Sequence, residues 1–125
     1  MVTAVPKEKL AHIARTLTTV PEGFHVNAKL KRLFLDKRAQ VFAKGEGFDW
    51  SFGEALAWGS LLIEGVPIRL SGQDSRRGTF TQRHAYFYDD TTRESWCPLK
   101  ALADETGTSI CIYNSLLSEV GVLGF

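Results

Sequence analysis

The chain has 125 residues, the length of one domain or of part of one. Hydrophobic residues make up 44% and charged residues 23%, which is ordinary for a globular protein in water. The net charge of +1 gives no overall attraction to nucleic acid or to a membrane surface. No apolar run approaches the ~20 residues that a bilayer-spanning helix needs, and Met1–Lys9 lack the pattern of a signal peptide. We therefore expect neither nucleic acid nor a membrane as a partner.

The two cysteines, Cys97 and Cys111, lack metal-ligand spacing. We expect no metal site in this chain, and we expect reduced thiols in an intracellular compartment.

Three helices are predicted in the first half of the chain. Apolar residues at helical spacing indicate a first helix over Pro6–Thr18. Asn27 is a suitable cap for a second helix over about 28–43, and Asp49 for a third over about 50–64. The third is apolar around more than half of its circumference, so we expect neighbours on two of its sides.

The second helix carries a row of basic side chains. We interpret these as a solvated face rather than a binding patch. They are Lys29, Lys31, Arg32 and Arg38.

The second half alternates strands and helices, which is typical of an α/β protein. We predict strands at Pro67–Ser71, His84–Tyr88, Glu94–Cys97 and Ser109–Tyr113, a helical turn at Pro98–Ala103, and a last helix beginning near Leu116 or Leu117 after Asn114 and Ser115. We expect a mostly parallel sheet flanked by helices. The last helix has no C-cap, so we expect the chain to stop inside an element and to be a fragment, truncated at its C-terminal end.

The polar segment after the first predicted strand is the first candidate site, because ligands of open α/β sheets bind at the carboxyl ends of the strands. Gln73 projects from that edge, and Arg77 and Arg83 have the fork geometry that binds a carboxylate. His84 is able to donate to the same anion. The alternative is a solvated loop whose arginines pair with local acids. RNA binding through these arginines and Phe80 lacks a stacking platform.

Glu119 is the second candidate, at a junction between a strand and a helix. Carboxylates are favoured in the first turn of a helix by the helix dipole, which is sufficient reason for an acid there. Apolar residues on both sides nevertheless predict partial burial, which would make Glu119 a candidate acid or base.

Several segments resemble the decarboxylating component of 2-oxoglutarate dehydrogenases, over nearly the whole chain. The most distinctive is Arg69–Ala85, whereas the pair Ser118-Glu119 is shared with related 2-oxo-acid dehydrogenases. The other matching segments are Val20–His25, Leu30–Arg32, Asp49-Trp50, Glu54–Ala57, Tyr113–Ser115 and Val122–Phe125. One departure is Leu116, where the family usually has proline, which affects loop rigidity.

The resemblance implies a thiamine-diphosphate-dependent oxidoreductase of the tricarboxylic acid cycle. It implies a helical lead-in at 1–48 and, at 49–125, the first part of a transketolase-like domain that binds the pyrimidine ring of the cofactor. The family's catalytic glutamate corresponds to Glu119, which would hydrogen-bond a pyrimidine nitrogen and activate the cofactor. Gln73 would lie near the cofactor, and Arg77, Arg83 and His84 are weaker substrate-binding candidates.

The implied substrate is 2-oxoglutarate, and the implied partners are a lipoyl-bearing succinyltransferase and a second copy of the full-length enzyme. The implied compartment is the bacterial cytoplasm or the mitochondrial matrix. The family holds the diphosphate and its Mg²⁺ with a Gly-Asp-Gly segment and an Asn in another domain, and no Gly-Asp-Gly occurs here. We therefore expect the 125-residue chain alone to bind thiamine diphosphate weakly and to be inactive.

Two alternatives stay open. The sequence could belong to another thiamine-dependent 2-oxo-acid dehydrogenase, acting on pyruvate or a branched-chain substrate. It could instead be a stand-alone, non-catalytic interaction module derived from this enzyme.

Overall fold

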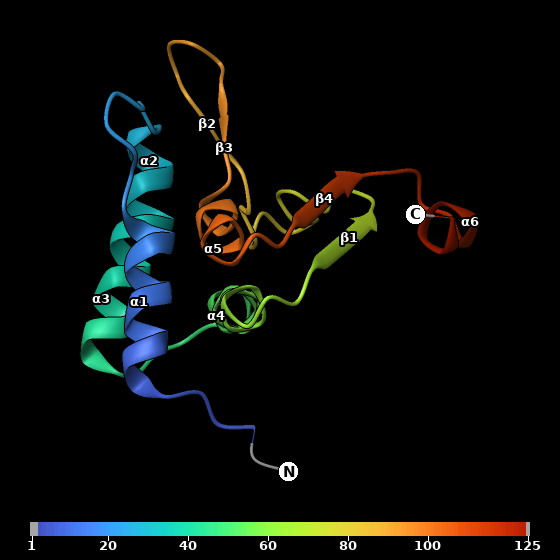
Figure 1. Cartoon of the computed structure of the whole chain (residues 1–125). Helices are drawn as coiled ribbons and strands as arrows, with labels where there is room; N and C mark the ends of the chain where they lie inside the picture. The colour runs from blue at the N-terminus through green and yellow to red at the C-terminus, as the bar shows by residue number, and fades with distance from the viewer. Residues whose placement is uncertain (1–2, 125) are drawn as a thin grey trace.

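The computed structural model describes residues 3–124 and combines helices with short strands (Figure 1). The small parallel sheet and its flanking helices are compatible with the predicted α/β class. In chain order the elements are α1 (Lys7–Thr18), α2 (Ala28–Leu30), η1 (Lys31–Asp36), α3 (Lys37–Lys44), α4 (Trp50–Ile63), β1 (Ile68–Gly72), β2 (Phe87–Tyr88), β3 (Ser95–Trp96), α5 (Pro98–Thr106), β4 (Ile110–Asn114) and α6 (Glu119–Leu123).

The predicted helix caps in the first half are confirmed. The Asn27 side chain accepts a hydrogen bond from the backbone N–H of Lys29, and Asp49 accepts one from Phe52. The predicted second helix is continuous from α2 to α3, but its middle, η1, is π-helical. π-Helical turns are rare in proteins, and those that occur often lie at functional sites.

The expected single sheet is only partly present. Strands β1 and β4 pair in parallel, from Ile68 opposite Ile110 to Gly72 opposite Asn114. Strands β2 and β3 pair with each other, antiparallel, as a separate hairpin. The predicted strand at His84 is shorter than expected because the backbone N–H groups of His84 and Ala85 donate to carbonyls of the preceding loop instead of to a neighbouring strand.

The last helix begins later than predicted. It starts at Glu119, and the hydroxyl of Ser118 caps it by accepting from Gly121. Asn114 is not the cap because it still belongs to β4, where it lies opposite Gly72. Pairing over the whole length of β1 therefore moves the strand end, and with it the start of α6.

Helix α4 packs against both α1 and α5, in agreement with its wide apolar surface. The core residues Ile13 of α1, Phe52 and Leu62 of α4, and Leu102 of α5 are all at most 1% exposed. At the crossing point α4 has Gly59, where an added Cβ would collide with the Ile13 side chain. The absence of a side chain there allows α1 to approach α4 closely.

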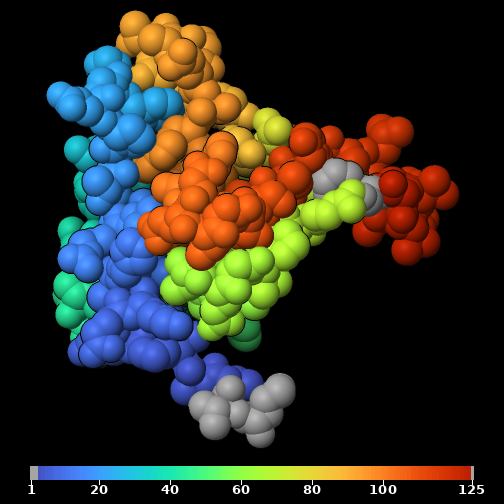
Figure 2. All heavy atoms as spheres, in the orientation of Figure 1, coloured from blue at the N-terminus to red at the C-terminus, as the bar shows by residue number. Residues whose placement is uncertain are grey.

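The α6 end of the chain projects from the rest of the molecule (Figure 2). The division into 1–48 and 49–125 falls in the connection between α3 and α4, and it stays a prediction. Within residues 3–124, no helix is long and apolar enough to cross a membrane.

Candidate functional site

The carboxyl ends of β1 and β4 form the edge on which the candidate residues gather. The Ser71 hydroxyl donates to the Ser115 hydroxyl at 2.9 Å, and the backbone N–H of Ser115 donates to the Gly72 carbonyl at 2.9 Å. These two hydrogen bonds continue the pairing beyond the sheet. They hold the loop that leads to Glu119 against the end of β1.

Glu119 is the first residue of α6 and lines a cavity of about 400 Å³ at this edge. The cavity is mainly apolar, and Glu119 supplies its only charged side chain. Its lining consists of Gly72, Leu116, Leu117, Ser118, Glu119, Val122 and Leu123.

The prediction that Glu119 is partly buried is wrong, because the residue is exposed in this chain. The reason is that the apolar neighbours do not fold over it. Leu116, Leu117 and Leu123 are themselves 83–87% exposed.

Two arginines of the loop between β1 and β2 have structural contacts. Arg83 forms a bidentate ion pair with Glu54 at 2.7 and 3.1 Å and also donates to the Ser75 carbonyl. Arg76 donates to the Ile112 carbonyl at 2.9 Å and lies over the ring of Tyr86. Both guanidinium groups therefore hold the loop to α4 and β4, although only that of Arg83 pairs with an acid.

Arg77 differs from these two because it is half exposed. Its guanidinium pairs with Asp74 at 2.6 Å, three residues earlier. It also lines a second cavity, of about 430 Å³, together with Asn114 at the end of β4 and His84.

His84 is the most unusual side chain of this cavity. It is buried against Phe34, with ring centroids 4.3 Å apart, and its Nε2 has no hydrogen-bond partner among the described residues. Burial lowers the pKa of His84, and the charges of Arg38 and Arg77 lower it further. The ring is therefore neutral at pH 7, with one nitrogen able to donate and the other able to accept.

The backbone of His84 is also unusual, with φ at +41°, a region that costs energy for a side chain other than glycine. His84 lines the second cavity, but its unpartnered Nε2 atom is buried. A buried polar atom without a partner is rare in native proteins, which makes His84 a candidate functional residue.

Gln73 directly follows β1 and is exposed. It lines neither cavity, although its neighbours Gly72 and Asp74 line one each. The structure thus brings together His84, Arg77 and Asn114, and it places Glu119 in an adjoining cavity on the same strand edge. It leaves Arg83 in a structural ion pair.

Sequence reasoning missed Asp89, which directly follows β2. Its carboxylate is 1% exposed and accepts from the backbone N–H groups of His25, Thr91 and Thr92 at 2.6–2.8 Å. These hydrogen bonds, of which the one from His25 has the largest effect, hold the pKa of Asp89 well below its ordinary range. Asp89 thereby fastens the segment before α2 to the hairpin that adjoins the His84 cavity. Within residues 3–124, no cluster of potential metal ligands is present.

The chain matches a segment of known enzymes. It is 49% identical over 124 residues to the 2-oxoglutarate dehydrogenase E1 components of Brucella anthropi, Brucella ovis and Brucella canis. The matches cover 98% of this chain and 12% of each relative. No family model matches the chain.

The parallel pair of β1 and β4 with its flanking helices is compatible with an α/β protein. By sequence the chain belongs to the family of 2-oxoglutarate dehydrogenase E1 components, of whose length it spans 12%.

Proposed function

We propose that this chain forms part of the pyrimidine-binding region of a thiamine-diphosphate-dependent, succinyl-transferring 2-oxoglutarate dehydrogenase. The observation that carries the proposal is the position of Glu119. It is the one charged side chain in an apolar cavity at the carboxyl end of two parallel strands. The transketolase-like character of the domain and its compartment, bacterial cytoplasm or mitochondrial matrix, belong to the same proposal.

The residues at this edge fit a flat heterocycle better than a diphosphate. The leucine and valine side chains around Glu119 offer apolar walls, and its carboxylate offers a hydrogen-bond acceptor for a ring nitrogen that carries a proton. No cation lines this cavity. The diphosphate and Mg²⁺ would therefore be held by groups outside this chain. When bound, thiamine diphosphate supplies the electron sink for decarboxylation of a 2-oxo acid.

Each candidate residue has a proposed role. Glu119 holds the proton at the pyrimidine nitrogen, in a site that becomes dry when the exposed apolar residues are covered. Arg77 and His84 both line the cavity of about 430 Å³, where they would bind substrate oxygen atoms. Gln73 would contact the cofactor from the end of β1. Arg83 would act by positioning the loop, because Glu54 already occupies its guanidinium.

The test uses the Brucella anthropi E1 component, with this sequence in place of its matching segment. In that chimera, Glu119→Gln should lower turnover of 2-oxoglutarate by about 100-fold or more, the range for loss of a positioned proton-transfer group. Glu64→Gln is the matched control, because Glu64 is an exposed acid at the end of α4. Near-normal turnover of the Glu119 variant would refute the assignment.

The substrate preference of the same chimera distinguishes a 2-oxoglutarate dehydrogenase from the related 2-oxo-acid dehydrogenases. We expect preference for 2-oxoglutarate over pyruvate and branched-chain 2-oxo acids, and a preference for either of the latter would assign the sequence to another 2-oxo-acid dehydrogenase. The purified 125-residue chain by itself should bind thiamine diphosphate weakly and should not decarboxylate 2-oxoglutarate. Measurable decarboxylation by that chain would contradict the proposed division of the site between domains.

The exposed apolar residues in and just before α6 favour a second candidate, an interaction module that acts without catalysis. Leu117, Val120 and Leu123 are 79–87% exposed, an unusual concentration of apolar surface for a water-facing protein. Such a module would co-purify with an intact E1 component. An inactive chimera, together with stable binding of this chain to the intact Brucella enzyme, would favour that function.

A further inference from the structure

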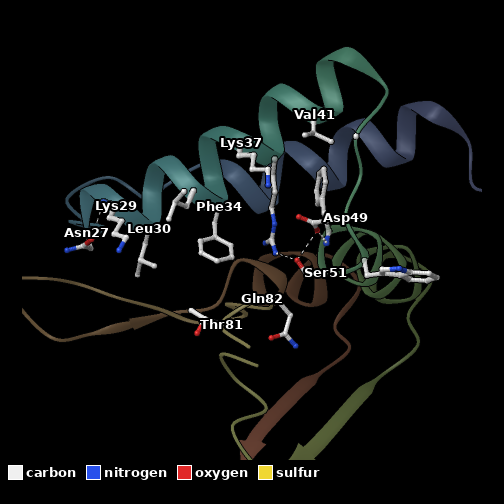
Figure 3. Close-up of a pocket in the computed structure, with 15 residues that line it drawn as sticks. Asn27, Lys29, Leu30, Phe34, Lys37, Val41, Asp49, Ser51, Thr81 and Gln82 are labelled. Atoms are coloured by element: carbon white, nitrogen blue, oxygen red, sulfur yellow. Dashed lines mark hydrogen bonds between the residues drawn. The ribbon is translucent and has the colours of Figure 1, made fainter. Parts of the chain in front are cut away.

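A third cavity lies on the other side of the molecule from α6, away from the strand edge, and the proposed function does not use it. It is a groove of about 740 Å³ between the helical layer α2–η1–α3, the start of α4, and the loop around Thr81. Leu30 and Phe34 extend from the helices toward Thr81 and Gln82 across the groove (Figure 3). Its volume falls within the range of small-molecule sites, which are largely apolar with a few polar groups.

The floor of the groove contains a buried cation. Arg38 was expected on a solvated face, but it is only 7% exposed. Its guanidinium lies 5.6 Å from the ring centre of Phe34 and 5.7 Å from that of Phe52, and it donates to the Ser51 hydroxyl and the Arg83 carbonyl. The side chain is buried because η1 and α3 place it between two aromatic rings.

No carboxylate of the described residues forms an ion pair with Arg38. Glu54 is held by Arg83, and the Oδ1 atom of Asp49 caps α4 through Phe52. Burial lowers the pKa of Arg38, opposed by the charges of Asp49 and Glu54. A buried cation without a paired anion is energetically costly, and an anion placed close to it would offset that cost.

The rim of the groove is also positive. Lys29 and Lys37 line it, both are exposed, and neither forms an ion pair with a described acid. Asp49 is the one acidic residue in the lining. The rest of the surface is apolar or uncharged, and it includes Trp50, which is 96% exposed. The groove therefore combines a net positive charge with aromatic and aliphatic walls.

We propose that this groove binds a small organic anion with an apolar or aromatic body. The carboxylate, sulfonate or phosphate of the ligand lies toward Lys29 and Lys37, because the Ser51 hydroxyl already donates to Asp49. Its apolar body packs on Leu30 and Phe34, with Trp50 at the open end. The site is separate from Glu119, and it adjoins the His84 cavity, with which it shares Asn27 and Leu30. It is a second ligand site, suited to an effector. The π-helical turn η1 contributes Leu33 and Phe34 to its wall.

The test measures binding of two fluorescent dyes to the 125-residue chain. Anilinonaphthalene sulfonate has an aromatic body and one negative charge, and phenylnaphthylamine has the same body without the charge. We expect the anionic dye to bind at least fivefold more tightly, and its binding to quench tryptophan fluorescence by energy transfer. Trp50→Phe should reduce that transfer without abolishing binding, because Trp58 and Trp96 remain as donors.

Substitutions of the rim lysines locate the site. Lys29→Gln with Lys37→Gln should weaken the anionic dye by about tenfold, about threefold for each rim charge, and should leave the neutral dye unchanged. Lys44→Gln is the matched control, because Lys44 is exposed on the same helix but does not line the groove. Dye bound to the exposed residues of α6 would not respond to any of these lysines.

Equal affinity for the two dyes, or equal effects of the groove and control lysines, would overturn the proposal. It would also be overturned if neither dye quenched Trp50 but an acidic peptide did, because the groove would then be a protein-docking surface. These outcomes are independent of the Glu119 chimera, which tests a different cavity.

Discussion

Replacing Gly59 of α4 with alanine tests the packing of α4 against α1 and α5. A Cβ at this position would collide with Ile13 Cγ2 of α1 and lie 3.1 Å from Leu102 Cδ1 of α5. Overpacking a filled core costs about 1–3 kcal/mol. Alanine in a helix gains about 1 kcal/mol over glycine. The net change is a loss of about 1 kcal/mol, or about 3–6 °C in Tm for a chain of this size.

Gly53 of the same helix provides the control. A Cβ there meets no atom within 4 Å, so Gly53→Ala keeps the helix propensity gain without the collision. We expect it to raise Tm by a few degrees. Thermal and urea unfolding followed by far-ultraviolet circular dichroism measures both variants. If Gly59→Ala were as stable as Gly53→Ala, α1 would not approach α4 as closely as described.

The remaining predictions concern one buried carboxylate and two ion pairs, of which one is partly buried and the other is exposed. Asp89 has a folded-state pKa below its ordinary value of 3.8, so its stabilisation is complete above about pH 4 and is lost as pH falls toward the folded pKa. Asp89→Asn should therefore destabilise the chain at pH 7, and the difference from wild type should shrink below pH 4 in urea titrations; a constant difference would contradict the backbone hydrogen bonds as its source. Glu54→Gln should lower the unfolding free energy by about 1–3 kcal/mol, because it leaves the partly buried Arg83 without its carboxylate. Lys100→Ala removes an exposed ion pair with Asp104 and should leave the urea midpoint unchanged. Equal effects of Glu54→Gln and Lys100→Ala would contradict the claim that the partly buried ion pair stabilises the chain more than the exposed one.

Local chemistry made much of the fold predictable. Asn27 and Asp49 are caps because their side chains reach backbone N–H groups two or three residues ahead, which depends on nothing distant. The start of α6 was not predictable in this way. It depends on β4 pairing with β1 as far as Gly72, which is a contact between distant parts of the chain.

In the candidate site, too, the features set by local sequence were predictable and those set by distant contacts were not. Position in the chain predicted that the loop with Arg77 and His84 would lie at the carboxyl end of a strand, and that Glu119 would lie at a strand-to-helix junction. It could not predict that Glu54, 29 residues earlier, occupies Arg83. Helical periodicity placed Arg38 on the solvated side, yet the loop carbonyl of Arg83 and the ring of Phe52 cover it. Both errors arise because a charged side chain is buried by partners that are remote in sequence.

The most direct test of the central claim is the rate at which the C2 hydrogen of bound thiamine diphosphate exchanges with deuterium, measured by NMR after rapid acid quench in the Brucella anthropi chimera. This rate reports cofactor activation independently of substrate binding and of succinyl transfer. If Glu119 holds the pyrimidine proton, Glu119→Gln should slow the exchange by about 100-fold or more, with Glu64→Gln unchanged. Equal exchange rates in the chimera with and without the Glu119 carboxylate would contradict the account.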